Sequence, residues 1–546
     1  MAAALVTETP RGDVTPSARD GSSHPSEPAT RTLQGTWLVA AGIVFAAAVA
    51  TGLVLRFWTR SELWLDEALT VNIAHLPLSQ LHQALKEDGA PPLYYVLLHF
   101  WMEIFGTSNF AVRSLSGVLS VLTLPVAWVA GRRFGGRSAA WAVTLLLATS
   151  PFAIYYGTEA RMYALVMFLT ACGFVALDRA LRDPKPGNLV AVAVVTAALL
   201  YSQYWSLYLI AVLGIYLIAK SLVTRVGWRA KSWWALGAVA VGCLAFAPWW
   251  PTFVYQSRHT GTPWAVPANF AAVINAITGF TDNQATLSTA GTDQGRLLAV
   301  LYFVLVALAL FGIARDRWRI DLDLRTRPRA RGMTFVVVAT LFVAIGGGIL
   351  SHSAFSPRYA AVVFVPLLLL VALGALTLEA PKIRAAVLLV GAAAGLAAAV
   401  PNITTQRTQA APVVDVIKAH AQPGDVVAFC PDQLGPATYR LMPADTYKTT
   451  TFPRGTSPAF VDWVDYKSTV QHTNAVDYAD QLVKEAGPGH RVWLVWAPGY
   501  QGFSNKCEQI VDQLTAASGN QSRMWIVENP SVYYEPMNLQ EFTPSP

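Results

Sequence analysis

Two adjacent carboxylates, Asp66 and Glu67, are the first side chains in the sequence that are placed to do chemistry. They follow an apolar run at residues 35–57, which is long enough to cross the roughly 30 Å hydrocarbon core of a bilayer. A carboxylate just beyond a membrane exit is hydrated on one side and desolvated on the other, which suits a reactive group. The alternative is a charged helix start, since acidic residues are common in first turns.

Further ionisable and aromatic residues fall in segments that map to the same side of the membrane. Arginines suit a phosphate, and aromatic rings suit sugars and isoprenoid chains. Structural explanations compete: Glu159 and Arg161 can form an ion pair between helices, and Arg358 can reach lipid phosphates. The residues are Asp88, Tyr94, Tyr95, His99, Glu159, Arg161, Tyr163, Gln203, Tyr204, His352, Arg358 and Tyr359.

The composition indicates an integral membrane protein with many spans. Of 546 residues, 54% are apolar and 13% are charged, against about 45–50% and about 25% in soluble domains. Mean hydropathy is +0.40. The net charge of +7 comes from short basic segments between apolar runs, which is typical of cytoplasmic loops and not of nucleic-acid binding.

Eleven apolar segments are candidate spans. Alternate connections are rich in Arg and Lys, so the positive-inside rule places them and the N-terminus in the cytoplasm. An odd number of spans then places the C-terminal region outside the cell. The segments are 35–57, 110–131, 138–156, 160–180, 188–203, 205–224, 233–254, 296–314, 333–352, 358–379 and 384–400.

The chain divides into three parts. Residues 1–34 are predicted to be a disordered cytoplasmic tail, and residues 35–401 a membrane domain. The membrane domain has two long outer loops, at residues 58–109 and 255–295, and the second contains Trp264 and shows no clear period. In the first loop, residues 69–85 show helical spacing and residues 93–105 predict a helix lying in the interface.

Residues 402–546 have the composition of a soluble domain. Strand patterns alternate with helical patterns, which predicts a small extracytoplasmic α/β domain. The strands are expected at 426–430, 492–496 and 524–527, and the helices at 413–420, 476–485 and 505–517. Cys430 and Cys507 lie in this domain and are predicted to form a disulfide if their Cα atoms lie within about 7 Å.

Several of these motifs, in this order, resemble the GT-C superfamily of polyprenyl-phosphate-sugar-dependent glycosyltransferases. The resemblance covers roughly residues 36–400. It is strongest to the protein O-mannosyltransferase and aminoarabinose transferase branch, including actinobacterial mannosyltransferase-like members. The C-terminal domain is similar in kind to that of the aminoarabinose transferases, although no motif matches there. Many relatives have His where this chain has Gln203. The motifs are Trp64-Leu65-Asp66-Glu67-Ala68, Pro91-Pro92-Leu93-Tyr94-Tyr95 with Arg113, Glu159-Ala160-Arg161-Met162-Tyr163 and Ser356-Pro357-Arg358-Tyr359.

The resemblance implies transfer of a sugar from a polyprenyl-phosphate donor to an acceptor of the cell envelope, with inversion at the anomeric carbon. Asp66 is then the general base, with Glu67 orienting the acceptor or a bound cation. Arg358 and Arg161 hold the donor phosphate. Mannose is the first expectation for the sugar and arabinose the second, and the acceptor is a glycolipid, a lipoglycan or a protein. The predicted substrate-binding residues are Asp88, Tyr94, Tyr95, His99, Glu159, Tyr163, Tyr204 and Tyr359.

Three questions stay open at this stage. Adjacent carboxylates can bind a divalent cation, but no full ligand set is evident in the sequence. A lipid or glycan transporter is the main alternative function, and it predicts charges near the bilayer midplane instead of at one interface. A non-catalytic envelope scaffold would explain the C-terminal domain, but it leaves the Asp-Glu pair without a role.

Overall fold

A computed structural model describes residues 29–223, 226–261, 269–282, 292–316, 319–325, 327–350, 355–500 and 502–544. Most of the predicted tail, together with Trp264 and His352, lies outside these residues. The chain forms two compact units, residues 1–44 and residues 45–546. Helix α1 (Ala29–Leu55) begins in the first unit, and everything below concerns the second unit.

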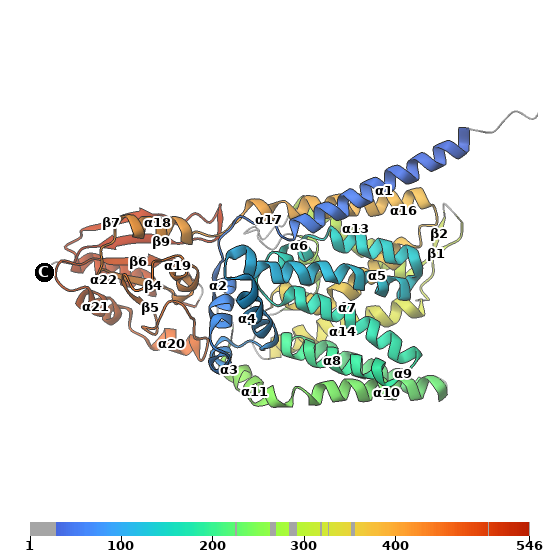
Figure 1. Cartoon of the computed structure of the whole chain (residues 1–546), viewed down its shortest axis with the longest axis horizontal. Helices are drawn as coiled ribbons and strands as arrows, with labels where there is room; N and C mark the ends of the chain where they lie inside the picture. The colour runs from blue at the N-terminus through green and yellow to red at the C-terminus, as the bar shows by residue number, and fades with distance from the viewer. Residues whose placement is uncertain are drawn as a thin grey trace, which may run out of the picture. The chain divides into compact units, whose positions relative to one another are not determined.

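Long apolar helices make up the membrane domain, which confirms the prediction of a polytopic helical membrane protein (Figure 1). Among the described residues, eight helices are long and apolar enough to cross a membrane, and three shorter apolar helices accompany them. Nearly every residue of α15 is buried, so this helix lies at the centre of the bundle. The long helices are α5 (Asn109–Ala148), α7 (Tyr163–Arg182), α9 (Ser206–Val223), α10 (Val226–Leu244), α13 (Asp293–Phe311), α14 (Pro328–Leu350), α15 (Ala361–Ala375) and α16 (Pro381–Ala399).

Helix α5 contains the predicted span 110–131 and the first part of the predicted span 138–156, the rest of which lies in the separate short helix Pro151–Gly157. Its backbone is non-helical at Gly136, where φ is 86° and ψ is −170°, a conformation that only glycine adopts readily. The segments on either side of this break pack together: a Cβ on Gly131 would lie 2.7 Å from Val143 Cγ1. The chain therefore reverses here, as the separate predictions for 110–131 and 138–156 require.

The first outer loop folds into three short helices, α2 (Leu65–His75), α3 (Leu78–Asp88) and α4 (Leu93–Phe105). The stretch 69–85 is two helices instead of one, because Pro77 follows Leu76 and pushes it into an extended conformation (φ −64°, ψ 152°). Helix α4 has the bounds expected for the interfacial helix. In Figure 1, α2 and α4 lie side by side, in agreement with their direct contacts.

Shorter elements complete the membrane domain. Helix α8 is one of the three shorter apolar helices, and α11 and α12 form part of the second predicted outer loop. These elements are α6 (Pro151–Gly157), α8 (Pro186–Ser202), η1 (Ala247–Trp249), α11 (Trp250–His259), α12 (Ala272–Gly279), β1 (Gly312–Ala314), β2 (Ile320–Leu322), η2 (Pro357–Ala360) and α17 (Pro401–Thr404).

The C-terminal region is an α/β domain built on a five-stranded sheet with the order β5-β4-β6-β9-β7 (Figure 1). Strands β5 (Lys448–Thr451), β4 (Val426–Cys430) and β6 (Val492–Trp496) are parallel, and β9 (Asn538–Phe542) and β7 (Ser522–Ile526) add antiparallel pairs. Strands β3 (Gln406–Thr408) and β8 (Tyr533–Glu535) form a separate parallel pair. The helices are α18 (Ala410–His420), η3 (Asp432–Leu434), α19 (Gly435–Tyr439), α20 (Tyr466–His472), α21 (Ala475–Ala486) and α22 (Lys506–Ala517).

A disulfide joins the end of β4 to the start of α22. It links Cys430 and Cys507, whose Cα atoms lie 5.6 Å apart. The two other cysteines, Cys172 and Cys243, are free.

Candidate active site

Asp66 and Glu67 occupy the first turn of α2, where the helix dipole favours negative charge. Although they are neighbours in the sequence, their surroundings differ sharply. The Asp66 side chain is 17% exposed, whereas the Glu67 side chain is fully buried. Their carboxyl groups accordingly have different arginine partners.

Glu67 sits between two buried arginines. Arg113 Nε donates to Oε1 at 2.7 Å and its Nη2 donates to Oε2 at 2.6 Å, which is a bidentate pair. Arg407 Nη1 donates to Oε2 at 3.2 Å, and the Ala160 N–H donates to Oε1 at 3.0 Å. Burial alone would raise the pKa of Glu67, but attraction to Arg113 and Arg407 outweighs it and lowers that pKa. Glu67 is thus held as a carboxylate whose oxygens are all occupied.

Asp66 faces a different pair of arginines. Arg358 Nη1 donates to its Oδ2 at 2.7 Å, and Arg161 Nη2 lies 4.0 Å from the same oxygen. These residues come from α2, from η2 and from the segment before α7. The structure therefore brings together the predicted base and both predicted phosphate ligands. No partner is recorded for Asp66 Oδ1 among the side chains that the structure describes.

A hydrogen-bonded chain leads from Arg161 to Asp88. Arg161 Nη1 donates to Thr70 Oγ1 at 2.8 Å and to the Tyr95 hydroxyl at 3.4 Å. That hydroxyl in turn donates to Asp88 Oδ2 at 2.6 Å. Burial raises the pKa of Asp88, partly offset by Arg161. Two of the predicted substrate residues, Asp88 and Tyr95, are therefore linked to Asp66 through Arg161.

Glu159 is fully buried, and neither of its carboxylate oxygens has a hydrogen-bond partner among the described residues. Burial is the main cause that raises the pKa of Glu159 to about 7. The nearby arginines Arg407 and Arg358 lower this pKa, and the carboxylates Glu67 and Asp66 raise it. An unpaired buried carboxyl group is costly unless it is neutral or meets a ligand.

Other polar atoms close to Asp66 are also buried without a hydrogen-bond partner in the described part of the chain. They are the Tyr163 hydroxyl, Arg358 Nε, Arg161 Nε and the Trp64 indole N–H. Arg358 and Arg161 thus each retain a donor that no protein group uses.

The remaining predicted residues lie at different distances from this centre. Tyr359 follows Arg358, whose guanidinium lies 5.6 Å from the Tyr359 ring centroid. The Tyr94 hydroxyl hydrogen-bonds Ser116 Oγ at 2.8 Å. His99 Nδ1 hydrogen-bonds the Ala74 carbonyl at 2.8 Å, near the C-terminal end of α2.

Tyr204 and Gln203 belong to the neighbouring outer turn. The Tyr204 hydroxyl accepts from Trp249 Nε1 and bonds Gln256, so it joins α11 to the bundle. Gln203 Nε2 donates to the Tyr359 carbonyl at 3.3 Å, which supports the turn that carries Arg358.

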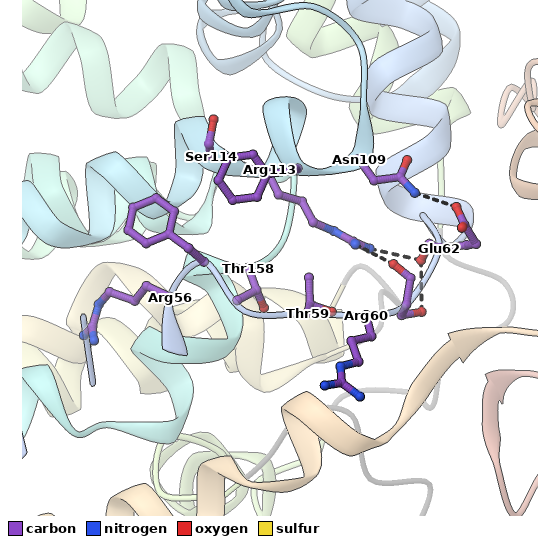
Figure 2. A pocket seen from close by; sticks show the side chains of 11 residues that line it. Arg56, Thr59, Arg60, Glu62, Asn109, Arg113, Ser114 and Thr158 are labelled. Carbon is purple, nitrogen blue, oxygen red and sulfur yellow. Dashed lines mark hydrogen bonds between the residues drawn. The ribbon is translucent and has the colours of Figure 1, made fainter. Parts of the chain in front are cut away.

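A cavity of about 230 Å³ lies beside the Glu67–Arg113 pair, between the end of α1 and the start of α5. Arg113 lines it, and its guanidinium donates to the carbonyls of Ser61 and Glu62 at 2.6 and 3.0 Å. Figure 2 shows Arg113 reaching toward the backbone of Glu62. Asn109 Nδ2 donates to the Glu62 carboxylate. Arg113 therefore connects this cavity to the buried carboxylate.

Sequence reasoning missed two partners of the acidic pair. Arg113 was part of a matched segment without a role, although a lone arginine in an apolar helix is a signal in itself. Arg407 lies 340 residues from Glu67 in the chain, in a region without any motif. No local pattern could have predicted that contact.

The described side chains include no cluster of three or more His, Cys, Asp or Glu that could hold a metal ion. Asp66 and Glu67 turn toward separate arginines instead of converging on one point. Their donor set does not fit a resident divalent cation.

A family model matches part of the membrane domain. Residues 89–251 match the family model described as dolichyl-phosphate-mannose-protein mannosyltransferase. No curated protein matches the chain.

The structures of ArnT show the same fold. ArnT from Cupriavidus metallidurans bound to undecaprenyl phosphate is 14% identical, with a TM-score of 0.56 over 92% of this chain and 98% of that chain. The apo state of the same protein is 13% identical, with a TM-score of 0.56 over 93% and 98%. An oligosaccharyltransferase from Archaeoglobus fulgidus is 10% identical, with a TM-score of 0.48 over 83% and 67%.

The family match lies within the membrane domain, and the likeness to ArnT extends through the C-terminal domain as well. The predicted resemblance to the GT-C superfamily of glycosyltransferases is therefore confirmed, and the chain shares the fold of ArnT over 92% of its length.

Proposed function

We propose that the chain is a membrane glycosyltransferase that moves a sugar from a polyprenyl-phosphate donor to a hydroxyl group of a cell-envelope acceptor on the outer face. The observation that carries the proposal is the Asp66–Arg358 pair at 2.7 Å, with Arg161 at 4.0 Å. It places one partly exposed carboxylate beside two cations, which is what a base and a leaving phosphate need. The family match and the ArnT-like fold support the donor class.

In this mechanism Asp66 accepts the proton of the acceptor hydroxyl as its oxygen attacks the anomeric carbon. The bond from that carbon to the phosphate oxygen breaks, and the polyprenyl phosphate leaves with the bonding electrons. A single displacement inverts the anomeric configuration. Charge grows on the phosphate, where Arg358 and Arg161 stabilise it.

Arg358 can hold Asp66 and bind the donor phosphate at the same time. Its Nη1 holds Asp66 while its Nε is buried without a partner in the described part of the chain. A guanidinium has five N–H donors in a fixed fork, so the same side chain can bind a phosphate and orient the base. Arg161 Nε is likewise without a partner among the described residues.

Glu67 supports the site from behind. With both oxygens taken by Arg113, Arg407 and the Ala160 N–H, it has no capacity left for an acceptor or a cation. We therefore assign it to fixing the start of α2, and so the direction of Asp66, in place of the acceptor-orienting role expected from the sequence.

Mannose is our first candidate for the sugar, because the matching family model describes a dolichyl-phosphate-mannose enzyme. One of the two ArnT structures is bound to undecaprenyl phosphate. We propose a polyprenyl phosphate carrier of this type, with arabinose as the second candidate for the sugar.

A transporter is less well supported. That function predicts ionisable groups near the bilayer midplane. Asp66, Glu67, Glu159, Arg161 and Arg358 instead lie in connections between long helices or at the end of a candidate span.

The direct test incubates membranes that contain the protein with radiolabelled polyprenyl-phosphate mannose. The parallel incubation uses membranes that lack the protein. We expect protein-dependent transfer of label into one envelope fraction. Export of intact labelled donor without transfer would instead support a transporter.

A further inference from the structure

The C-terminal domain reaches the residues around Asp66 directly. Arg407, in β3, is 1% exposed and binds Glu67 at 3.2 Å, and it also donates to the Thr158 carbonyl and hydroxyl at 3.0 and 2.7 Å. Its backbone N–H donates to Ser61 Oγ at 2.6 Å. The β3–β8 pair is therefore anchored to the membrane domain beside the acidic motif.

Strand β8 places Tyr534 next to this motif. The Tyr534 ring meets the Trp64 ring edge-on, with centroids 5.1 Å apart. The Arg358 guanidinium lies 5.9 Å from the same Trp64 ring. Contacts thus run without a break from Tyr534 through Trp64 and Arg358 to Asp66.

Glu535, the next residue, is 7% exposed. The Thr408 side chain and the Leu65 backbone N–H contact its carboxyl group, while Oε2 has no hydrogen-bond partner among the described residues. Burial raises the pKa of Glu535 to about 8, so near neutral pH the carboxyl group carries a proton. A neutral carboxyl group can both donate to and accept from a hydroxyl group.

Further polar side chains lie at one edge of the five-stranded sheet. This is the edge at which its parallel strands have their carboxyl ends. The chain leaves β4, forms β5 on one side of it and then β6 on the other side, which creates the switch point where open α/β sheets bind ligands. Gln433 follows β4 and Tyr500 follows β6, and Tyr500 donates to Gln433 Oε1 at 2.7 Å. Tyr500 lies close enough to interact electrostatically with Glu535, Tyr534 and Asp66.

The chemistry of these residues differs from that of the membrane domain. Tyr534, Tyr500 and Glu535 offer aromatic surface and hydroxyl-type hydrogen bonds, with no cation among them. Gln433 is buried, and its amide is engaged by Tyr500 and Tyr466. Arg407, in the strand β3 that pairs with β8, is already committed to Glu67. This set suits a neutral, hydroxyl-rich ligand, whereas Arg358 and Arg161 suit a phosphate.

We propose that Tyr534 and Glu535 bind a carbohydrate acceptor and present one of its hydroxyl groups to Asp66. The donor then occupies the membrane-domain side of the site and the acceptor the side formed by the β3–β8 pair. This proposal rests on the proposed transferase function and adds the class of the acceptor to it.

The test measures transfer by the purified full-length protein in detergent, with polyprenyl-phosphate mannose as the donor. The acceptor probes are an octyl mannoside and a threonine-containing peptide. Tyr534→Ala and Glu535→Ala should each raise the KM for the octyl mannoside by about threefold to tenfold, since a net hydrogen bond contributes about 0.5–1.5 kcal/mol. The affinity for undecaprenyl phosphate should not change.

Milder variants guard against misfolding. Glu535→Gln keeps the size and polarity of the side chain, so it should restore most of the acceptor affinity that Glu535→Ala loses. Tyr534→Phe keeps the ring and separates the contribution of the hydroxyl. Tyr533→Ala, in the same strand, is the matched control and should leave both constants near those of the wild type.

The outcomes distinguish the two proposals. If the wild-type protein transfers no sugar to any acceptor, the proposed function fails. If it transfers sugar but the KM for the octyl mannoside is unchanged in all the Tyr534 and Glu535 variants, this inference alone is wrong. Transfer to the peptide in preference to the octyl mannoside would also overturn it.

Discussion

At the scale of single residues, two neighbouring carboxylates have opposite surroundings. Asp66 is partly exposed, and each of its two arginine neighbours has an Nε without a partner among the described residues. Glu67 is buried, and hydrogen bonds occupy both of its carboxylate oxygens. The difference arises because successive residues of a helix point about 100° apart. A side-by-side acidic pair can therefore supply one reactive group and one anchor.

We predict that Glu67→Gln destabilises the protein far more than Asp66→Asn. The first change leaves Arg113 and Arg407 buried without a counter-charge, and breaking such a buried pair costs about 3–5 kcal/mol. Thermal unfolding of both purified variants in detergent measures this difference. Equal midpoints would show that the Glu67 network does not hold the site together.

At the scale of elements, the apolar pattern predicted most of the helices because membrane spans must be long and continuous. The reversal inside α5 depends on one residue, Gly136, with its positive φ. A Cβ there would meet no atom within 4 Å, so the backbone conformation alone is at stake.

We expect Gly136→Ala to lower the thermal midpoint by a few degrees, since this backbone region costs other residues about 1–3 kcal/mol. Gly187→Ala is the matched control: it also has open space around it, but its φ is not positive. A Gly136→Ala midpoint no lower than that of the control would contradict the assigned role of the glycine.

The C-terminal domain was predictable only in part. Strands β4 and β6 have the bounds expected from their apolar runs, and α21 and α22 follow the amphipathic pattern. Strand β9 was missed because Asn538–Phe542 is a mostly polar sequence, although it lies between β6 and β7 and is largely buried. The β3–β8 pair was missed for a similar reason: three-residue strands carry no period.

At the scale of the whole molecule, the site joins segments that are far apart in the chain. Arg358 is 292 residues from Asp66, and Arg407 is 340 residues from Glu67. The sequence predicted candidate site residues and the side of the membrane on which they are expected. It could not indicate which arginine meets which carboxylate, because that depends on how the helices and the C-terminal domain pack.

The proposed mechanism requires the acidic motif and the C-terminal domain to face away from the cytoplasm. In a background with Cys172→Ser and Cys243→Ser, we expect Lys418→Cys to react with a membrane-impermeant thiol reagent in intact cells. Arg325→Cys, in a basic connection, should react only after the membrane is opened. Both positions are described by the structure, and Lys418 is exposed. The reverse labelling pattern would place Asp66 on the cytoplasmic face and overturn the mechanism.

The most direct test of the central claim compares Asp66→Asn with Arg358→Ala in one assay of turnover and one of undecaprenyl-phosphate binding. Asp66→Asn removes the base and keeps its size, so turnover should fall by about 10²–10⁴-fold. Its affinity for undecaprenyl phosphate should not fall, because the arginines remain and a nearby negative charge is lost. Arg358→Ala should weaken both binding and turnover, while Arg258→Ala, at an exposed arginine outside the site, should change neither. Turnover by folded Asp66→Asn at nearly the wild-type rate would show that Asp66 is not the base.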